Sequence, residues 1–290
     1  MKRPPTENAL AGGPEPMPIV LPEDHPGFHD MSYRAHRAVI ADAARRFRPG
    51  DPLPAVAYTE AERGMWRTVS AELAGAHREH ACQEYLAGAD MLRLPSDRVP
   101  QLAEVSGALH GLTGFTLTPA ADLVEARSFY GSLADRRFQA TQYLRHPDSP
   151  MFSPEPDMIH EVIGHGVHLA NRRIAELYRL IGETVRRLET PEAVALVSRI
   201  FWFTIEYGLV REKRRSTVIG ASLLTSYGEL QQYRGAHVRP LDAESMFRQK
   251  YRIDVFQPVL FEADSFNHLE DFLHATLTEL DDGRSQSAAA

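Results

Sequence analysis

The chain of 290 residues contains a single cysteine, Cys82. One thiol excludes an intramolecular disulfide, so we expect a reducing, cytoplasmic setting and a small, buried side chain at this position. The chain also lacks the roughly 18 consecutive apolar residues of a membrane-spanning helix. Its start lacks the charged and then apolar pattern of a secretory signal. These absences predict a protein without a membrane partner.

An excess of positive charge is missing as well. The chain has 32 Lys and Arg against 39 Asp and Glu, and its net charge is −7. Proteins bind the phosphate backbone of nucleic acids through basic surfaces, so we expect no nucleic acid as a main partner of this acidic chain. With 43% hydrophobic and 24% charged residues, the composition is that of an ordinary globular protein. A small-molecule partner is therefore the expectation.

Repeats, and linkers rich in glycine or proline, are absent from the middle of the chain. This absence predicts one domain over 21–282. Residues 1–20 contain five prolines and no periodic apolar pattern, so we expect a disordered tail there. A second disordered tail is expected at 283–290, which ends in SQSAAA.

Helical periodicity dominates the folded part. Tyr33, Val39 and Ile40 share one stripe at helical spacing, and Thr59–Glu62 has the pattern of a capping box before a second helix. Residues 114–118 are β-branched and aromatic, which favours a short strand, but they have few companions. The predicted fold class is therefore mainly α, with a few short β-strands.

One stretch, PEPDMIHEVIGHGVHL, places His160 and His165 around Glu161. Two histidines in one short apolar segment suggest a divalent metal, because neutral imidazole is a common metal ligand. The histidines are five residues apart, which puts them about 140° from each other on an ideal helix. Gly164 lets the backbone distort or end the helix, so that His165 returns toward the site.

A third metal ligand is expected further downstream. Glu206 is the only charged residue in IFWFTIEYGLV, which has the pattern of a buried helix. A cation beside Glu206 would remove the cost of burying its carboxylate. Two histidines and one carboxylate with open positions are the ligands of mononuclear non-haem iron oxygenases, but a hydrolytic zinc site uses the same residue types. A metal-free, all-α binding module with core histidines is a third alternative.

The segments PEPDMIHEVIGH, FWFTIEYGL and IGASLLTSYGEL, in this order, resemble the signature segments of the pterin-dependent aromatic amino acid hydroxylases. The bacterial members of this family are phenylalanine hydroxylases. Shorter segments such as DHPGF, CQEYL, TGFTL and TQYLRH extend the resemblance over about residues 21–280.

The resemblance implies that His160, His165 and Glu206 bind Fe(II) and leave positions open for water and dioxygen. It places Glu161 beside the pterin, where it assists oxygen activation. In a zinc hydrolase the same glutamate would be the general base for water. A tetrahydropterin, such as tetrahydrobiopterin, supplies the two electrons that hydroxylation needs beyond those of the substrate.

The resemblance also implies contacts with the cofactor and with the amino acid. Phe129 matches the aromatic residue on which the pterin stacks, and Val124 lies where the backbone contacts the pterin. Arg145 matches the arginine that binds the substrate carboxylate, and Asp157 matches the acid that orients it. A planar guanidinium suits such bidentate recognition.

Five further positions complete the implied site. Ser153 and Thr225 match residues that add hydroxyl contacts to the amino acid. Pro156 and Trp202 match the walls of the ring pocket. Glu229 matches a residue that supports the iron ligands.

Several residues bear on the substrate and on the ring position. Trp202 matches phenylalanine and tyrosine hydroxylases, and Ile253 is apolar where tyrosine hydroxylases have an acid. Tyr207 and Ser222 replace a phenylalanine and a glycine of the common pattern, and Gly166–His168 replace a stretch that usually contains proline. A shift of about 1 Å changes the geometry of attack, so Tyr207 and Ser222 are candidates for control of regioselectivity.

The leading prediction is an Fe(II)- and tetrahydropterin-dependent monooxygenase that hydroxylates free L-phenylalanine with O2 at the para position. Meta-hydroxylation to meta-tyrosine and hydroxylation of another aromatic amino acid, such as tryptophan, are the alternatives within the family. The animal members have a regulatory domain and a tetramerising helix for which the chain has no room, so we expect a monomer.

Overall fold

The structure is a computed structural model that describes residues 21, 23, 25–151, 155–253 and 255–283. The expected tail at 1–20 lies outside the described residues, as do Ser153 and all of the expected tail 283–290 except Gly283.

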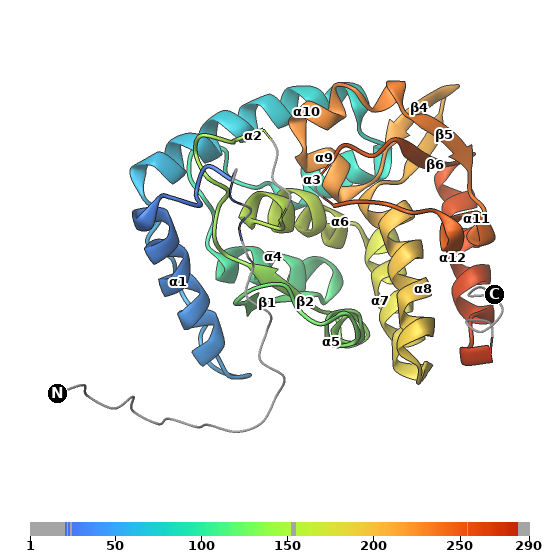
Figure 1. The fold of residues 1–290 in the computed structure, drawn as a ribbon, viewed down its shortest axis with the longest axis horizontal. Coiled ribbons are helices and arrows are strands. Elements are labelled where there is room, and N and C mark those ends of the chain that lie inside the picture. The colour runs from blue at the N-terminus through green and yellow to red at the C-terminus, as the bar shows by residue number, and fades with distance from the viewer. Residues whose placement is uncertain (1–20, 22, 24, 152–154, 254, 284–290) are drawn as a thin grey trace.

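The described residues form a mainly α fold with a few short strands, which confirms the predicted class (Figure 1). The α-helices are α1 (Met31–Arg46), α2 (Glu60–His80), α3 (Gln83–Leu92), α4 (Leu102–Thr113), α5 (Ala126–Leu133), α6 (Val167–Ala170), α7 (Arg172–Arg187), α8 (Pro191–Phe201), α9 (Ala221–Thr225), α10 (Tyr227–Leu230), α11 (Ala243–Arg248) and α12 (Phe266–Glu279). The other helices are the π-helices η1 (His160–Gly166) and η2 (Trp202–Glu206) and the 3₁₀-helix η3 (Tyr233–Gly235).

Local side-chain contacts explain where several helices begin. The Thr59 side chain accepts the Glu62 N–H, and the Glu62 side chain accepts the Thr59 N–H at the start of α2, so the predicted capping box is confirmed. Asn171 accepts the Arg173 N–H at the start of α7. These contacts satisfy backbone donors that have no partner within the helix.

The stripe expected along α1 is only partly correct. Tyr33 and Ile40 are buried, but Val39 is 66% exposed. Helical spacing predicts which residues share a broad face, whereas the packing partners decide how much of that face is covered.

The strands form two small sheets. They are β1 (Thr116–Ala120), β2 (Arg137–Thr141), β3 (Leu209–Glu212), β4 (Arg215–Val218), β5 (His237–Pro240) and β6 (Val259–Ala263). β1 pairs with β2 in parallel, and the second sheet has the order β4-β3-β6-β5, with β3 and β4 antiparallel. The first strand starts two residues later than expected because Gly114, at φ +80°, ends α4 in the left-handed conformation that glycine favours.

Several helices pack around α7, which follows the histidine segment along the chain. α4, α5, α6, α8 and α12 each contact α7, and α7 and α8 lie side by side in Figure 1. Residues of α7 that face these neighbours, such as Ile174, Tyr178 and Ile181, have no exposed surface. α7 therefore packs against α6, which follows η1, and against α8, which leads into η2.

Gly182 marks the closest approach between α7 and α5. A Cβ at this position would lie 2.2 Å from the Ala134 nitrogen, so the helices would have to move apart. We expect Gly182→Ala to lower the free energy of unfolding by about 1–3 kcal/mol in urea titrations. Gly131→Ala in α5 is the control, because a Cβ there meets nothing within 4 Å. It should be neutral or slightly stabilising, and an equal loss in both variants would contradict the close-contact explanation.

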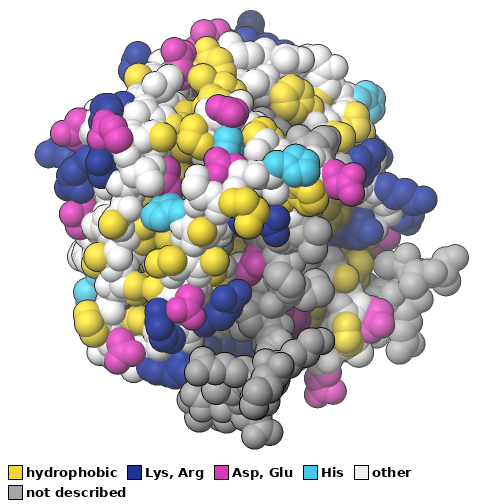
Figure 2. Space-filling view, turned by 60° about the vertical axis from the view of Figure 1, so that its left-hand side comes forward, with side chains coloured by type: hydrophobic (Ala, Val, Ile, Leu, Met, Phe, Trp, Pro, Cys, Tyr) yellow, Lys and Arg dark blue, Asp and Glu magenta, His cyan; other side chains and the backbone are white. Residues whose placement is uncertain are grey.

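The surface carries charges of both signs. On the face in Figure 2, the described residues show Lys and Arg side chains interspersed with Asp and Glu, without a broad basic area. Among the described helices, none is long and apolar enough to cross a membrane.

Candidate active site

Two π-helices carry the predicted metal ligands. η1 contains His160 and His165, and η2 ends at Glu206. Hydrogen bonds in a π-helix span five residues, so its wider turn brings residues five apart toward the same face. The Nε2 atoms of His160 and His165 lie 2.9 Å apart. The expected backbone distortion is therefore present, and it extends through the whole histidine segment.

Gly164 has a second role within η1. A Cβ there would lie 3.2 Å from both the Cβ and the carbonyl oxygen of Ala221, and 3.3 Å from Cγ2 of Thr225. The absence of a side chain therefore lets α9 pack closely against η1. This contact brings Thr225 and Ser222 of α9 to the histidines.

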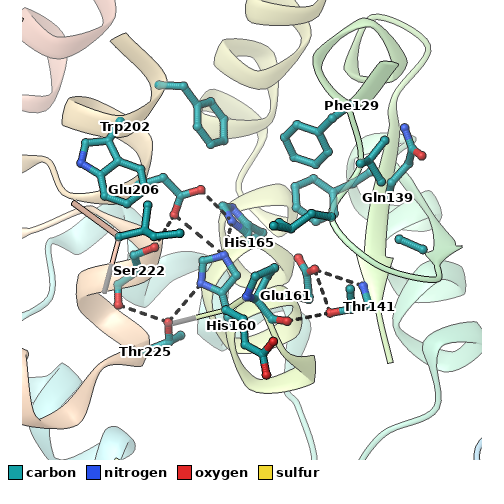
Figure 3. Close-up of a pocket in the computed structure, with 18 of the residues that line it drawn as sticks. Phe129, Gln139, Thr141, His160, Glu161, His165, Trp202, Glu206, Ser222 and Thr225 are labelled. Carbon is teal, nitrogen blue, oxygen red and sulfur yellow. Dashed lines mark hydrogen bonds and ion pairs between the residues drawn. The ribbon is translucent and has the colours of Figure 1, made fainter. Parts of the chain in front are cut away.

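The three predicted ligands converge on one point (Figure 3). Glu206 Oε1 lies 3.2 Å from His165 Nε2, and Glu206 Oε2 lies 3.9 Å from His160 Nε2. One nitrogen or oxygen atom from each residue lies within 4.8 Å of the others. This spacing and this set of donor atoms fit a single divalent metal ion.

Electrostatics favour the ligand forms of these side chains. Burial disfavours the charged form of Glu206, but His165, His160 and a hydrogen bond from Ser222 outweigh it and hold its pKa at about 2. Burial, followed by the neighbouring His165, lowers the pKa of His160 to about 4. Glu206 is therefore a carboxylate and His160 a neutral imidazole near pH 7.

A cavity of about 290 Å³ lies next to the three ligands. In Figure 3, Trp202 lies on one side of the ligands, and Phe129 and Gln139 lie on the other. Residues on both sides contribute to the lining. The cavity thus has two sides that meet at the ligands.

Glu161 points away from the ligand cluster toward β2. Its Oε1 accepts hydrogen bonds from the N–H of Thr141 at 3.0 Å and from the Thr141 hydroxyl at 3.1 Å. Burial raises the pKa of Glu161 to about 7, although His165 and Thr141 oppose the increase. Glu161 lines the cavity without joining the cluster of possible ligands. Its place beside the cofactor stays a prediction.

The two residues predicted to contact the pterin both line the cavity. Phe129, on α5, is half-buried, and its ring packs edge-on against Phe138 at 5.3 Å and Phe201 at 6.2 Å. Val124 lies in the connection between β1 and α5. These aromatic contacts hold the Phe129 ring in place beside the cavity.

Arg145 and Asp157 form a buried ion pair at the cavity. Nε and Nη2 of Arg145 donate to the two Asp157 carboxylate oxygens at 2.9 and 2.8 Å. Arg145 Nη1 donates to the carbonyl oxygens of Thr225 and Pro150 at 3.3 Å each. Arg145 lines the cavity, whereas Asp157 is not among the lining residues. Asp157 therefore orients the guanidinium at the edge of the cavity.

Trp202 and Pro156, the predicted walls of the ring pocket, line the cavity together with Tyr207, Ser222 and Ile253. Trp202 packs at 4.7 Å from the Tyr207 ring and stacks on Tyr251 at 4.4 Å. The Ser222 hydroxyl donates to Glu206 Oε2 at 2.7 Å.

Thr225 and Glu229 have different surroundings from each other. Thr225 lines the cavity, and its Oγ1 lies 3.4 Å from His160 Nδ1. Glu229 is not among the described residues of the lining, and its Oε1 accepts the Gln257 N–H at 2.5 Å. Its predicted support of the ligands would therefore act through intervening residues.

The sequence did not point to several residues of the site. Thr141 holds Glu161, Tyr251 stacks on Trp202, and Tyr178 contacts His165 through its hydroxyl, 2.6 Å from Nδ1. These residues lie 13 or more positions from their partners. The sequence offered one signal, the hydroxyl of Tyr178 on the apolar face of a helix. This signal alone does not indicate which residue the hydroxyl contacts.

The cluster of His160, His165 and Glu206 beside a two-sided cavity has the donor set of a mononuclear metal site with two histidines and one carboxylate. The sequence profile of the family described as "Biopterin-dependent aromatic amino acid hydroxylase" matches residues 17–282. The chain therefore belongs to the biopterin-dependent aromatic amino acid hydroxylases and is an aromatic amino acid monooxygenase. This confirms the predicted family and enzyme class, and neither the zinc hydrolase nor the metal-free module receives support.

Individual relatives give a finer comparison. The chain is 45% identical over 258 residues to "Phenylalanine 3-hydroxylase" of Streptomyces coeruleorubidus. The aligned region covers 89% of this chain and 92% of that protein. The chain is 41% identical over 258 residues to bovine "Tyrosine 3-monooxygenase" (Bos taurus), covering 87% of this chain but only 52% of the bovine one. The chain thus spans about half the length of this animal relative.

A solved structure of Chromobacterium violaceum phenylalanine hydroxylase, with bound iron(III) and 7,8-dihydrobiopterin, matches with a TM-score of 0.71. The two chains are 28% identical, and the match covers 76% of this chain and 82% of that one.

Proposed function

We propose that this chain hydroxylates free L-phenylalanine at the meta position, with Fe(II) and a tetrahydropterin. The observation that carries the proposal is the 45% identity, over nearly the full length, to a relative named phenylalanine 3-hydroxylase. The para position, which led the sequence-based predictions, is less well supported than the meta alternative. The domain bounds 21–282 and the monomeric state stay predictions.

The site supports a division of roles between its two sides. His160, His165 and Glu206 would hold the iron, with Phe129, Val124 and Glu161 on the pterin side. Arg145 would bind the substrate carboxylate, and Trp202 with Pro156 would enclose its ring. When bound, iron and tetrahydropterin supply activated oxygen and two electrons, so that one oxygen atom enters the ring and the other is reduced to the level of water.

Two residues on the ring side support the meta position. Ser222 donates to the carboxylate of Glu206, and Tyr207 packs against the face of Trp202. Ser222 therefore constrains the carboxylate of a ligand, while Tyr207 fixes the indole that would contact the substrate. We infer that both contacts influence which ring carbon is attacked, because a shift of about 1 Å changes the geometry of attack.

One residue of the lining favours phenylalanine over tyrosine as the substrate. Ile253 borders the cavity with an apolar side chain, so it offers no partner to a phenolic hydroxyl. A substrate hydroxyl without a hydrogen-bond partner binds unfavourably.

One incubation tests the proposed reaction. Fe(II)-loaded protein is mixed aerobically with a tetrahydropterin and, separately, with L-phenylalanine, tyrosine and tryptophan. Products are resolved against ortho-, meta- and para-tyrosine standards. We expect meta-tyrosine from phenylalanine. Para-tyrosine as the main product would overturn the proposed ring position, and pterin oxidation without any product from the three would overturn the substrate.

A double variant tests the role of Ser222 and Tyr207. We expect Ser222→Gly with Tyr207→Phe to move product from meta- to para-tyrosine, because the carboxylate of Glu206 and the Trp202 ring lose these constraints. The para-to-meta ratio should rise by at least about tenfold, which corresponds to about 1.4 kcal/mol. Tyr130→Phe is the control. It also removes a hydroxyl from a residue of the lining, but this residue packs against the Phe129 ring and its hydroxyl contacts Ser198. An unchanged isomer ratio in the double variant would contradict this explanation.

A further inference from the structure

A buried chain of hydrogen bonds leads from His165 away from the cavity. The hydroxyl oxygen of Tyr178 lies 2.6 Å from His165 Nδ1 and 2.9 Å from His168 Nδ1. Nε2 of His168 lies 2.7 Å from the carbonyl oxygen of Ile219. The three side chains are 1%, 0% and 0% exposed for His165, His168 and Tyr178, so water does not compete for these contacts.

The carbonyl group of Ile219 fixes the direction in which these hydrogen bonds are donated. A carbonyl oxygen can only accept, so Nε2 of His168 must carry a proton. If His168 is neutral, its Nδ1 accepts the Tyr178 O–H, and the Tyr178 oxygen accepts the Nδ1–H of His165. His165 Nε2 then has a free lone pair, and this atom faces His160 and Glu206.

The surroundings of His168 favour its neutral form. Its described polar contacts are Tyr178 and the Ile219 carbonyl, and Tyr85 packs edge-on against its ring at 5.9 Å. No carboxylate is among them, so a charge on this buried ring would lack a counter-ion. A charged His168 would donate from Nδ1 to the Tyr178 oxygen, and the Tyr178 hydroxyl would then donate to His165 Nδ1. The proton of His165 would then lie on Nε2, where it would block a metal.

The far end of the chain is tied to the third ligand. The N–H groups of Ile219 and Gly220 both donate to the carbonyl oxygen of Gly208, at 3.1 and 3.0 Å. A Cβ on Gly220 would lie 2.3 Å from the carbonyl oxygen of Glu206. The segment that anchors His168 therefore packs directly on the backbone of Glu206.

We propose that His168 and Tyr178 are positioning residues that set the tautomer and ring orientation of His165 for metal binding. This inference rests on the proposed metal site, because it assigns His165 as a ligand. Residues that orient a metal-bound histidine typically change metal affinity by 10- to 100-fold when replaced. These hydrogen bonds link His165 to the backbone of Ile219, and the next residue, Gly220, packs on the backbone of Glu206. Two of the proposed ligands, from different π-helices, are thus connected to the same backbone segment.

Tyr178→Phe gives the first test, with Co(II) alone as the probe, in the absence of pterin and substrate. Co(II) is titrated into metal-free protein, and its visible absorption is followed. We expect the Kd for Co(II) to rise about 10- to 100-fold and the shape of the absorption bands to change, because His165 loses its orienting partner.

Tyr85→Phe is the matched control. Tyr85 is also buried, and its hydroxyl donates to the carbonyl oxygen of Ile163 within η1 and lies 3.3 Å from His77 Nδ1. It has no contact with a ring nitrogen of the described ligands, so its loss should change the Kd less than about threefold. Equal losses in the two variants would show a general effect of a missing buried hydroxyl and would overturn the proposal.

His168 provides a second pair of variants in case Tyr178→Phe does not fold. His168→Leu removes the acceptor for Tyr178, whereas the amide oxygen of His168→Asn can replace Nδ1 as acceptor. We expect weak Co(II) binding in the first and a Kd within about threefold of wild type in the second. Equal affinity in both would overturn the role of His168. If the wild-type protein itself bound no Co(II), the proposed metal site would fail along with this inference.

Discussion

Replacing Glu206 by glutamine should abolish iron binding at equimolar concentration and lower product formation by more than about 100-fold. The carboxylate is the only anionic group among the three described ligands, and its charge attracts a divalent ion more strongly because the side chain is buried. Replacing a residue that only orients a ligand already costs 10- to 100-fold in affinity, so loss of the ligand charge should cost more. Iron content after desalting and single-turnover product yield measure the two effects.

A second cluster in the chain provides the control. Cys82, Glu84 and Glu212 also bring possible ligand atoms together. Cys82 is fully buried, as expected, Glu84 pairs with Arg173 at 3.1 Å, and Glu212 accepts the Gln83 N–H. These groups are already engaged, so Glu212→Gln should leave the iron content at one per chain. A full equivalent of iron with wild-type affinity in Glu206→Gln would contradict the assigned ligand.

The second large effect is expected from Asp157→Asn. Arg145 and Asp157 are 2% and 0% exposed, so the substitution leaves a buried guanidinium without its counter-charge. We expect the free energy of unfolding of the substrate-free protein to fall by about 3–5 kcal/mol in urea titrations. The KM for the amino acid should also rise, because the guanidinium loses the partner that orients it.

Asp157 stabilises more than the arginine. Its Oδ1 accepts the N–H of His160 at 3.1 Å, at the point where η1 begins. Iron affinity should therefore fall in Asp157→Asn as well, which a simple loss of substrate binding would not cause.

Asp135→Asn is the matched control for the ion pair. Asp135 also contacts arginines, Arg137 and Arg186, but its side chain is 38% exposed. Such surface pairs contribute about 0–1 kcal/mol. If the two variants lost the same stability, burial would not be the cause of the effect.

Local signals in the sequence determined much of the fold. The capping box before α2 and the β-branched segment at β1 both correspond to elements of the structure. Each depends on neighbours within a few residues, and for this reason a linear pattern contains them. The pairing of β6 between β3 and β5 was not predicted, because β6 lies about fifty positions from β3 and about twenty from β5.

The sequence by itself also predicted His160, His165 and Glu206 as metal ligands, because two histidines and a lone carboxylate in apolar segments suggest a bound cation. What it did not determine is how residues five apart on a helix meet at one point. Only the tertiary structure decided this. α9 packs on η1 at Gly164, and Gly220 packs on the backbone of Glu206 at the end of η2. The hydrogen-bond chain through Tyr178 and His168 likewise depends on the packing of α7 against α6. Contacts between distant segments follow from which surfaces exclude water together, and this depends on the whole chain.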